Sequence, residues 1–161
     1  MATLTFEGIN EYAEQIARLN DKAEGMIKRA VYDGAAVVLA AAVKEIEGLP
    51  VIANRYRSTE LPMKGVTETQ KQGLLDGVGL AKMQNDNGYV NTKLGFTGYN
   101  KVRDGKYKNG QPNALIARSV NSGSSVRVKI PFINRAVTAA KAKAEAAMKD
   151  RFDADTKNMI K

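Results

Sequence analysis

Cysteine, histidine and tryptophan are all missing from this 161-residue chain. Without cysteine the chain can form no disulfide and offers no thiolate nucleophile. Without cysteine and histidine it also lacks the usual ligands of zinc, and the side chain that most often transfers protons near neutral pH. The sequence therefore excludes Cys/His metal sites and any catalysis that depends on these two residue types.

A long hydrophobic run is missing as well. The longest weakly charged stretch, residues 34–43, is about half of the ~20 residues that a helix needs to cross a bilayer. The first residues show neither the basic region nor the apolar core of a secretory signal peptide. We therefore expect a protein of the cytoplasm that has no membrane partner.

Proline is scarce, with four residues, and no segment is of low complexity. Hydrophobic residues make up 43% of the chain and charged residues 26%, close to the averages of globular proteins. A chain of this length can bury one hydrophobic core. We predict a single domain over residues 1–161, with exposed loops near residues 51–66 and 97–113.

The spacing of hydrophobic residues predicts an α+β fold. In this fold a small, mostly antiparallel sheet is flanked by a long N-terminal helix and a C-terminal helix. The expected helices cover about residues 9–19, 22–47 and 67–83 and begin again at 131. The expected strands cover residues 3–6, 89–96, 114–120 and 126–130, with a tight turn at residues 85–88.

Residues 126–130 alternate between β-branched and basic side chains. In a strand this pattern places the apolar residues on one face and Arg127 and Lys129 on the other. Pro131 has no amide hydrogen for a strand ladder, and its fixed φ suits the first turn of a helix. We therefore predict a strand that ends at Pro131 and continues directly into the last helix.

The net charge of +8 is concentrated in one part of the chain. Residues 101–129 carry seven basic side chains and one acidic side chain, whereas residues 1–47 carry five basic and eight acidic ones. Clustered cations indicate a polyanion or an acidic protein surface as a neighbour. The candidate residues for this contact are Lys101, Arg103, Lys106, Lys108, Arg118, Arg127 and Lys129.

Three uses of these cations fit the sequence. Tyr99 and Tyr107 lie among them, and cations with interleaved aromatic residues suit phosphate contact and base stacking. The same cations also fit a solvated loop. A third use is ion pairing, across a subunit interface, with acidic residues near the N-terminus, namely Glu7, Glu11, Glu14 and Asp21.

Catalytic signals are weak by comparison. No spacing among the 17 carboxylates marks a general acid and base, and Gly77-Val78-Gly79 is part of no phosphate-binding fingerprint. Ser122, Ser124 and Ser125 lie in a turn without a histidine base, so a serine hydrolase would need a lysine as its base. We expect no enzyme, no metal and no cofactor.

Four segments follow one another in a distinctive order. They are Gly8-Ile9 with Glu11, Gly34-Ala35, Leu49-Pro50-Val51, and Pro131-Phe132-Ile133 with Ala136. In their order and spacing they resemble the neck and tail-completion family of long-tailed bacteriophages, whose members are small head–tail joining proteins. The middle of the chain departs from the family, because residues 51–70 and 115–125 replace its Asp-Thr-Gly-x-Leu and Glu-Phe-Gly-Thr segments.

The resemblance implies a structural virion protein and no enzyme. The subunit would form part of a homo-oligomeric ring that joins the head to the tail or terminates the tail. It would contact neighbouring head-completion and tail-tube proteins, with genomic DNA passing through the lumen. It would lie at the head–tail interface of the virion, and in the host cytoplasm during assembly. Arg127 and Lys129 would face a neighbour or the lumen. The alternative is a sequence-independent nucleic-acid-binding protein.

Overall fold

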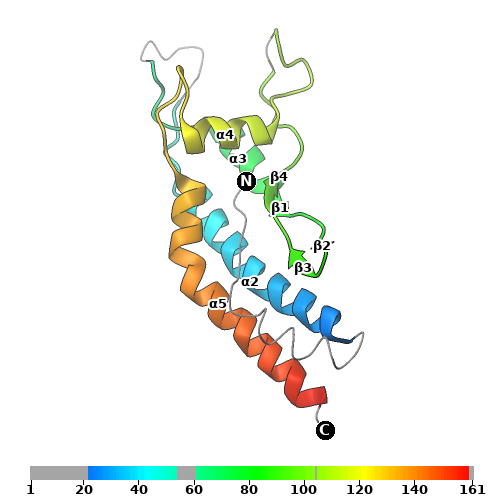
Figure 1. Ribbon diagram of the computed structural model, residues 1–161. Helices are drawn as coiled ribbons and strands as arrows, with labels where there is room; N and C mark the ends of the chain where they lie inside the picture. The colour runs from blue at the N-terminus through cyan, green and yellow to red at the C-terminus, as the bar shows by residue number, and fades with distance from the viewer. Residues whose placement is uncertain (1–21, 54–60, 104, 160–161) are drawn as a thin grey trace. The chain divides into compact units, whose positions relative to one another are not determined.

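The computed structural model describes residues 22–53, 61–103 and 105–159. These residues form four helices, α2 (Lys22–Glu47), α3 (Glu68–Gly77), α4 (Asn113–Ser122) and α5 (Phe132–Met159) (Figure 1). They also form four short strands, β1 (Val78–Leu80), β2 (Gln84–Asp86), β3 (Tyr89–Asn91) and β4 (Leu94–Phe96). β1 pairs with β4 and β2 with β3, giving two small antiparallel sheets.

The α+β class, with a long N-terminal helix and a C-terminal helix, is confirmed. The predicted helix over residues 22–47 coincides with α2, and α5 begins one residue after Pro131. α5 continues to Met159 through a polar tail whose sequence does not predict a helix. The predicted strand at 3–6 and the predicted helix at 9–19 lie outside the described residues.

The contacts of the chain group into two compact units, to which both long helices contribute. The first unit contains residues 22–38 of α2, residues 80–94 and residues 140–159. The second unit contains the described residues of 39–79 and 95–139.

In the first unit, α2 packs against α5 through small and flexible side chains. Its buried cluster consists of Ala23, Met26, Ala30, Val31, Met148 and Phe152. Gly34 is part of the contact, because a Cβ at this position would overlap Cγ of Met148 and lie 3.2 Å from the carbonyl oxygen of Ala144. The glycine therefore allows a close approach between the two helices, which the larger hydrophobic residues of α2 would prevent.

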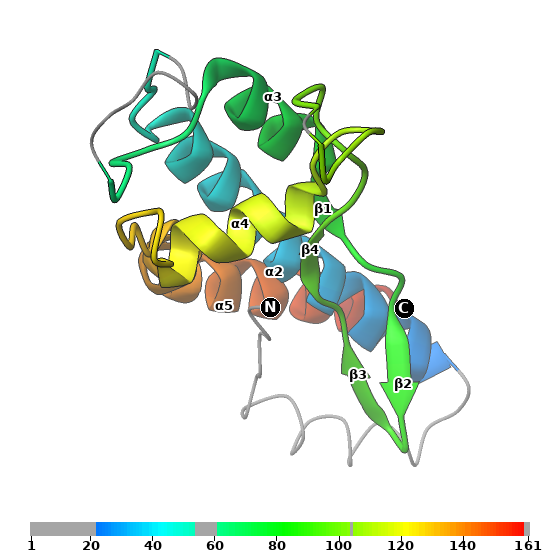
Figure 2. The same cartoon turned by 90° about the horizontal axis from the view of Figure 1, so that it is seen from above.

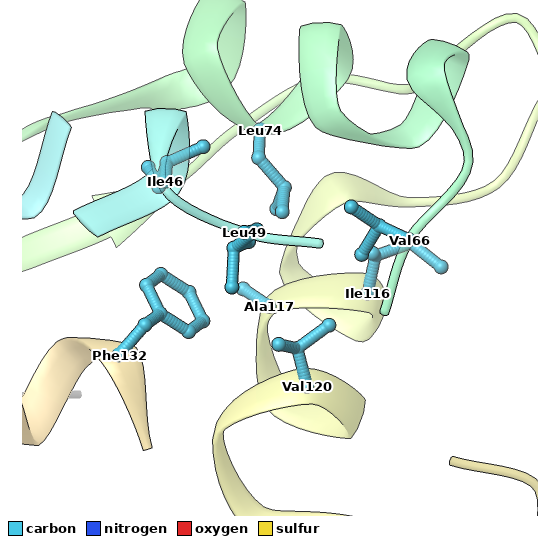
Figure 3. Close-up of a cluster of buried hydrophobic side chains, with 8 residues drawn as sticks. All are labelled: Ile46, Leu49, Val66, Leu74, Ile116, Ala117, Val120 and Phe132. Carbon is cyan, nitrogen blue, oxygen red and sulfur yellow. The ribbon is translucent and has the colours of Figure 1, made fainter. Parts of the chain in front are cut away.

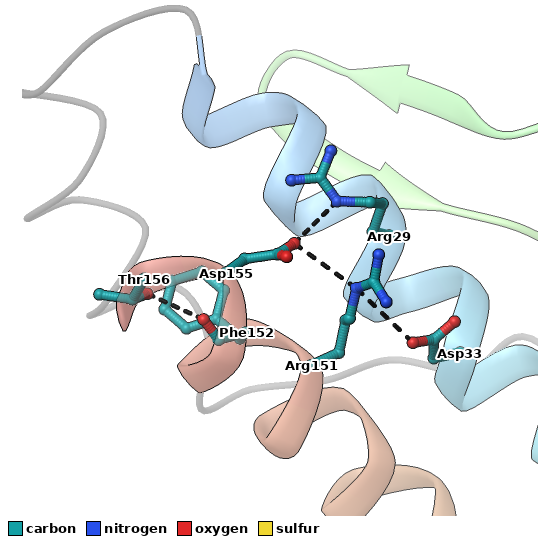
Figure 4. A network of polar contacts seen from close by, with 6 residues as sticks. All are labelled: Arg29, Asp33, Arg151, Phe152, Asp155 and Thr156. Carbon is teal, nitrogen blue, oxygen red and sulfur yellow. Dashed lines mark hydrogen bonds and ion pairs between the residues drawn. The ribbon is translucent and has the colours of Figure 1, made fainter. Parts of the chain in front are cut away.

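Ion pairs border this helix contact (Figure 4). Arg29 Nε donates to Oδ2 of Asp155 at 2.7 Å. Arg151 Nε lies 3.6 Å from the same oxygen and 3.8 Å from Oδ2 of Asp33. These side chains are largely solvated, apart from Asp155, so we expect each pair to add less than about 1 kcal/mol to stability.

The β2–β3 hairpin belongs to the same unit (Figure 2). Asn87 and Gly88 have φ values of 54° and 92°, as a two-residue type I′ turn requires. Asn85 supports the turn, because its Oδ1 accepts a hydrogen bond from the amide of Gly88 at 2.8 Å. The predicted turn at residues 85–88 is thus confirmed, and Asn85 also donates through Nδ2 to Glu24 of α2 at 3.0 Å.

The second unit has its own hydrophobic core (Figure 3). Its buried members are Ile46, Leu49, Val66, Leu74, Ile116, Ala117, Val120 and Phe132. The rings of Phe132 and Phe96 meet edge to face, with their centroids 6.1 Å apart. α2, α3, α4 and the start of α5 all contribute side chains to this core.

Helix ends in the second unit are closed by side chains. Thr67 caps α3, and Gln70 completes a capping box with it. Lys71 Nζ donates to the carbonyl oxygens of Glu47 and Leu49 at 2.5 and 3.3 Å, which places a cation at the C-terminal end of α2. At the start of α5, Asn121 Oδ1 accepts from the amide of Ile133 at 3.0 Å.

Two predicted strands are wrong. Residues 114–120 belong to α4, whose buried residues Ile116, Ala117 and Val120 follow a helical spacing, while Leu115 is exposed. Residues 126–130 contain no strand, because reciprocal backbone hydrogen bonds of 2.9 and 3.2 Å between Ser124 and Arg127 close a tight turn. Short apolar segments do not distinguish a helix from a strand, and here packing decides the outcome.

Three further boundaries differ from the predictions. α3 ends at Gly77, and residues 78–80 form a strand where we expected the helix to continue to residue 83. The predicted strand at 89–96 is interrupted at Thr92 and Lys93. The described part of the predicted loop at 51–66 is irregular but not wholly exposed, since Met63 and Val66 are buried.

Gly34 and Gly25 offer a matched pair of substitutions on α2. A Cβ at Gly25 would make only an ordinary 3.5 Å contact with Arg29. Gly25→Ala should therefore raise the free energy of unfolding by up to about 1 kcal/mol through helix propensity. Gly34→Ala should lower it by a net of about 1–2 kcal/mol, because overpacking outweighs that gain. Urea denaturation followed by circular dichroism measures the free energy of unfolding of each variant. Equal stabilisation by the two substitutions would contradict the close contact between α2 and α5.

Glu24 gives a prediction for pH. A hydrogen bond from Lys28, a second from Asn85 and the charge of Lys28 hold its pKa below the ordinary 4.5. Because the folded-state pKa is the lower one, this stabilisation is present above pH 4.5 and is lost as pH falls through the folded pKa. Lys28→Met should return the pKa of Glu24 toward 4.5 in an NMR titration, while Lys44→Met, on the same helix, should leave it unchanged.

Candidate functional site

The main cluster of predicted site residues lies on one loop of the second unit, residues 99–111, which we name the basic loop. This loop projects from the second unit beside the N-terminal end of α4 (Figure 1). The side chains of Lys101, Arg103, Lys106 and Lys108 are all exposed on it. Within the described part of the chain, no carboxylate forms an ion pair with Lys101, Arg103 or Lys108. Their charge is therefore directed at solvent or at a partner.

Two tyrosines lie among these cations. The side chain of Tyr99 is 66% exposed, which is high for a large aromatic residue. Nζ of Lys106 lies 5.5 Å from the ring centroid of Tyr107, within the range of a cation–π contact. The loop thus presents aromatic rings and positive charge together, as the sequence predicted.

The base of the loop is fixed by hydrogen bonds. The amide of Asn100 donates to the carbonyl oxygen of Gln111 at 2.9 Å, and the amide of Gln111 donates to Val102 at 3.1 Å. Asn100 Oδ1 accepts from the amide of Val102 at 2.9 Å. Gly110 has a φ of +99°, and a Cβ there would overlap the carbonyl oxygen of Asn100. The two ends of the loop are therefore held together while its cations stay exposed.

A buried polar network continues inward from the loop base. Gln70 Nε2 donates to Oε1 of Gln111 at 2.7 Å, and Arg127 Nη2 donates to Oε1 of Gln70 at 3.2 Å. Arg127 Nη1 also donates to the carbonyl oxygen of Gly65. The three side chains are at most 3% exposed. The network links α3, the turn at 124–127, the segment around Gly65 and the basic loop.

Arg127 was predicted to face a neighbour or the lumen, and this prediction is wrong. The tight turn at Ser124 replaces the predicted strand, so the alternation of faces does not hold. Arg127 is buried, and Val126, which the pattern assigned to the core, is 42% exposed. The charge of Arg127 therefore supports the fold of the second unit and is not part of its surface.

Arg118 and Lys129 are exposed but lie apart from the basic loop. Arg118 is in the middle of α4, and Lys129 packs beside Gly123, at the C-terminal end of this helix. A ten-residue helix is ~15 Å long. The basic loop and Lys129 are thus at opposite ends of α4, and the seven predicted residues do not form one continuous patch.

Several structural residues of this site were not identified from the sequence. Gln70 was detectable, because Thr67-x-x-Gln70 is the signature of a capping box. Asn100, Gln111 and Asn113 are buried in the second unit although their residue types are usually exposed. No local sequence signal distinguishes them from the solvated amides of an ordinary loop.

Two other features, a metal-binding cluster and a membrane-spanning helix, are absent from the described ranges. No group of three or more acidic, cysteine or histidine side chains within them could hold a metal ion. Among the helices of these ranges, none is both long and apolar enough to span a membrane.

Arg127 and Arg118 provide a test of the buried network. Arg127→Met removes charged hydrogen bonds to buried acceptors, so the free energy of unfolding should fall by about 1.5–3 kcal/mol. Arg118→Met changes the same residue type at an exposed position, so its free energy of unfolding should stay within about 0.5 kcal/mol of that of the parent protein. Urea unfolding curves for the two variants give the comparison, and similar small effects would contradict a structural role for Arg127.

Comparison with protein-family models, with curated protein sequences and with solved structures finds no match to this chain.

Proposed function

We propose that this protein is a structural subunit of the head–tail junction of a long-tailed bacteriophage, where it forms part of a ring that joins or terminates the tail. The proposal assigns it no catalytic activity. Its partners would be further copies of the same chain and the neighbouring head-completion and tail-tube proteins.

The observation that carries the proposal is the role of the resembling segments in the fold. Gly34 lies against Met148 at the contact between α2 and α5. Leu49, at the exit of α2, and Phe132, at the start of α5, are both buried in the core of the second unit. Ala136 is also buried. Each described segment of the family pattern thus has a packing role, as residues that specify a common fold would have.

Exposed apolar side chains support a role in assembly. Leu61, Val51 and Val126 are 64%, 47% and 42% exposed. They lie on segments that backbone pairing holds together, since Val51 pairs with Val66 and the amide of Met63 donates to Val126 at 3.0 Å. Such side chains are available for contacts between subunits.

The second candidate is a sequence-independent nucleic-acid-binding protein that acts outside the particle. The basic loop favours it, because exposed lysine, arginine and tyrosine side chains suit contact with a phosphate backbone. The two candidates differ in the defect that follows when the gene is disrupted, so particle morphology separates them.

Electron microscopy of a lysate in which this gene alone is disrupted tests the proposal. We expect DNA-filled heads separate from tails if the ring joins the two, or tails of aberrant length if it terminates them. Supplying the intact gene in trans is the control and should restore complete particles. Normal, joined particles from the disrupted gene would contradict the proposed function.

A further inference from the structure

The exposed charge of the basic loop is almost entirely of one sign. Four cations occur between residues 101 and 108, and the sequence places a single carboxylate, Asp104, among them. Three of the four are lysines, whose compact ammonium groups bind phosphate as point charges. Contacts of this kind neutralise a phosphate backbone and release its counterions, which gives affinity that does not depend on base sequence.

The composition of the loop favours nucleic acid over an acidic protein as its partner. The centre of a protein–protein interface is apolar. The only aliphatic side chain of the loop is Val102, which is half-buried. The large apolar surface that the loop does expose is the aromatic ring of Tyr99. In contacts with a DNA backbone, lysine, arginine and tyrosine side chains all donate hydrogen bonds to phosphate oxygens, and no aliphatic centre is needed.

The base of the loop is also held together before any ligand binds. Ordering side chains and loops on binding reduces affinity, and a preorganised loop avoids part of this cost. Two backbone hydrogen bonds close the loop base, one from the amide of Asn100 to Gln111 and one from the amide of Gln111 to Val102. Gln111 is in turn held by Gln70, and Gln70 by Arg127. Arg127 acts here as a positioning residue, and the exposed cations would make the contact.

From these observations we infer that the basic loop is a preformed contact for the phosphate backbone of duplex DNA. The inference rests on the proposed function, in which DNA passes through the ring, and it adds the surface that would meet that DNA. It assigns the contact to Lys101, Arg103, Lys106 and Lys108, and not to Arg127.

Two triple variants with the same change in net charge test the inference. The first replaces Lys101, Arg103 and Lys108 by glutamine. The second replaces Lys141, Lys143 and Lys149 by glutamine, three exposed lysines of α5. Binding of the full-length protein and of each variant to fluorescent duplexes of two unrelated sequences is measured by anisotropy across a range of salt concentrations.

For the parent protein we expect similar affinity for both duplexes and a steep fall in affinity as salt rises. The loop variant should bind about tenfold or more weakly. Its slope of log affinity against log salt should be shallower by about 2.7, or about 0.9 for each phosphate that the variant no longer neutralises. The affinity of the α5 variant for the duplexes should stay within about threefold of that of the parent protein. Circular dichroism of both variants checks that they remain folded.

Three results would overturn the inference: no duplex binding by the parent protein at low salt, equally weakened binding by the two variants, or loop-dependent binding to polyglutamate but not to DNA. The last result would assign the loop to an acidic protein partner. The binding measurements need only purified protein, whereas the proposed function is tested on particles. Failure of the loop contact and failure of the junction role are therefore seen in separate experiments.

Discussion

The guanidinium of Arg127 places a positive charge in the interior of the second unit, where a charge is stable only if its hydrogen bonds are satisfied. Its acceptors, Gly65 and Gln70, are 62 and 57 positions away in the sequence. Gln70 can accept from Arg127 because its position at the third residue of α3 is fixed by the capping box with Thr67. A single buried side chain thus links a turn, the segment around Gly65 and the start of α3, and through Gln70 it is connected to the base of an exposed loop.

This arrangement separates two functions of positive charge. Sequence alone groups Arg127 with the neighbouring cations, because all of them are basic and lie within one segment. In the structure Arg127 stabilises the residues that hold the ends of the basic loop. The exposed lysine and arginine side chains provide the positive surface charge that a partner would contact. The surface charge of the second unit is correspondingly smaller than the sequence suggests, and it is concentrated at the N-terminal end of α4.

Local features of the fold were predictable, and features that depend on distant contacts were not. The extent of α2, the cap at Thr67 and the turn at residues 85–88 follow from residues that lie next to one another in the sequence. α4 and the turn at Ser124 depend on which side chains the rest of the unit buries. The cations of the basic loop are exposed as predicted, although residues near its two ends are buried. The burial of Arg127 depends on two distant acceptors, the carbonyl oxygen of Gly65 and the side-chain oxygen of Gln70.

The exposure of Tyr99 has a practical consequence, because the chain contains no tryptophan. An indole introduced in place of Tyr99 would be the only one in the protein, and its emission could be excited without exciting the five tyrosines that remain. The edge of the basic loop would then carry its own optical probe. Quenching or a spectral shift of this probe would report directly on what approaches the loop, whether in a purified sample or in an assembling particle.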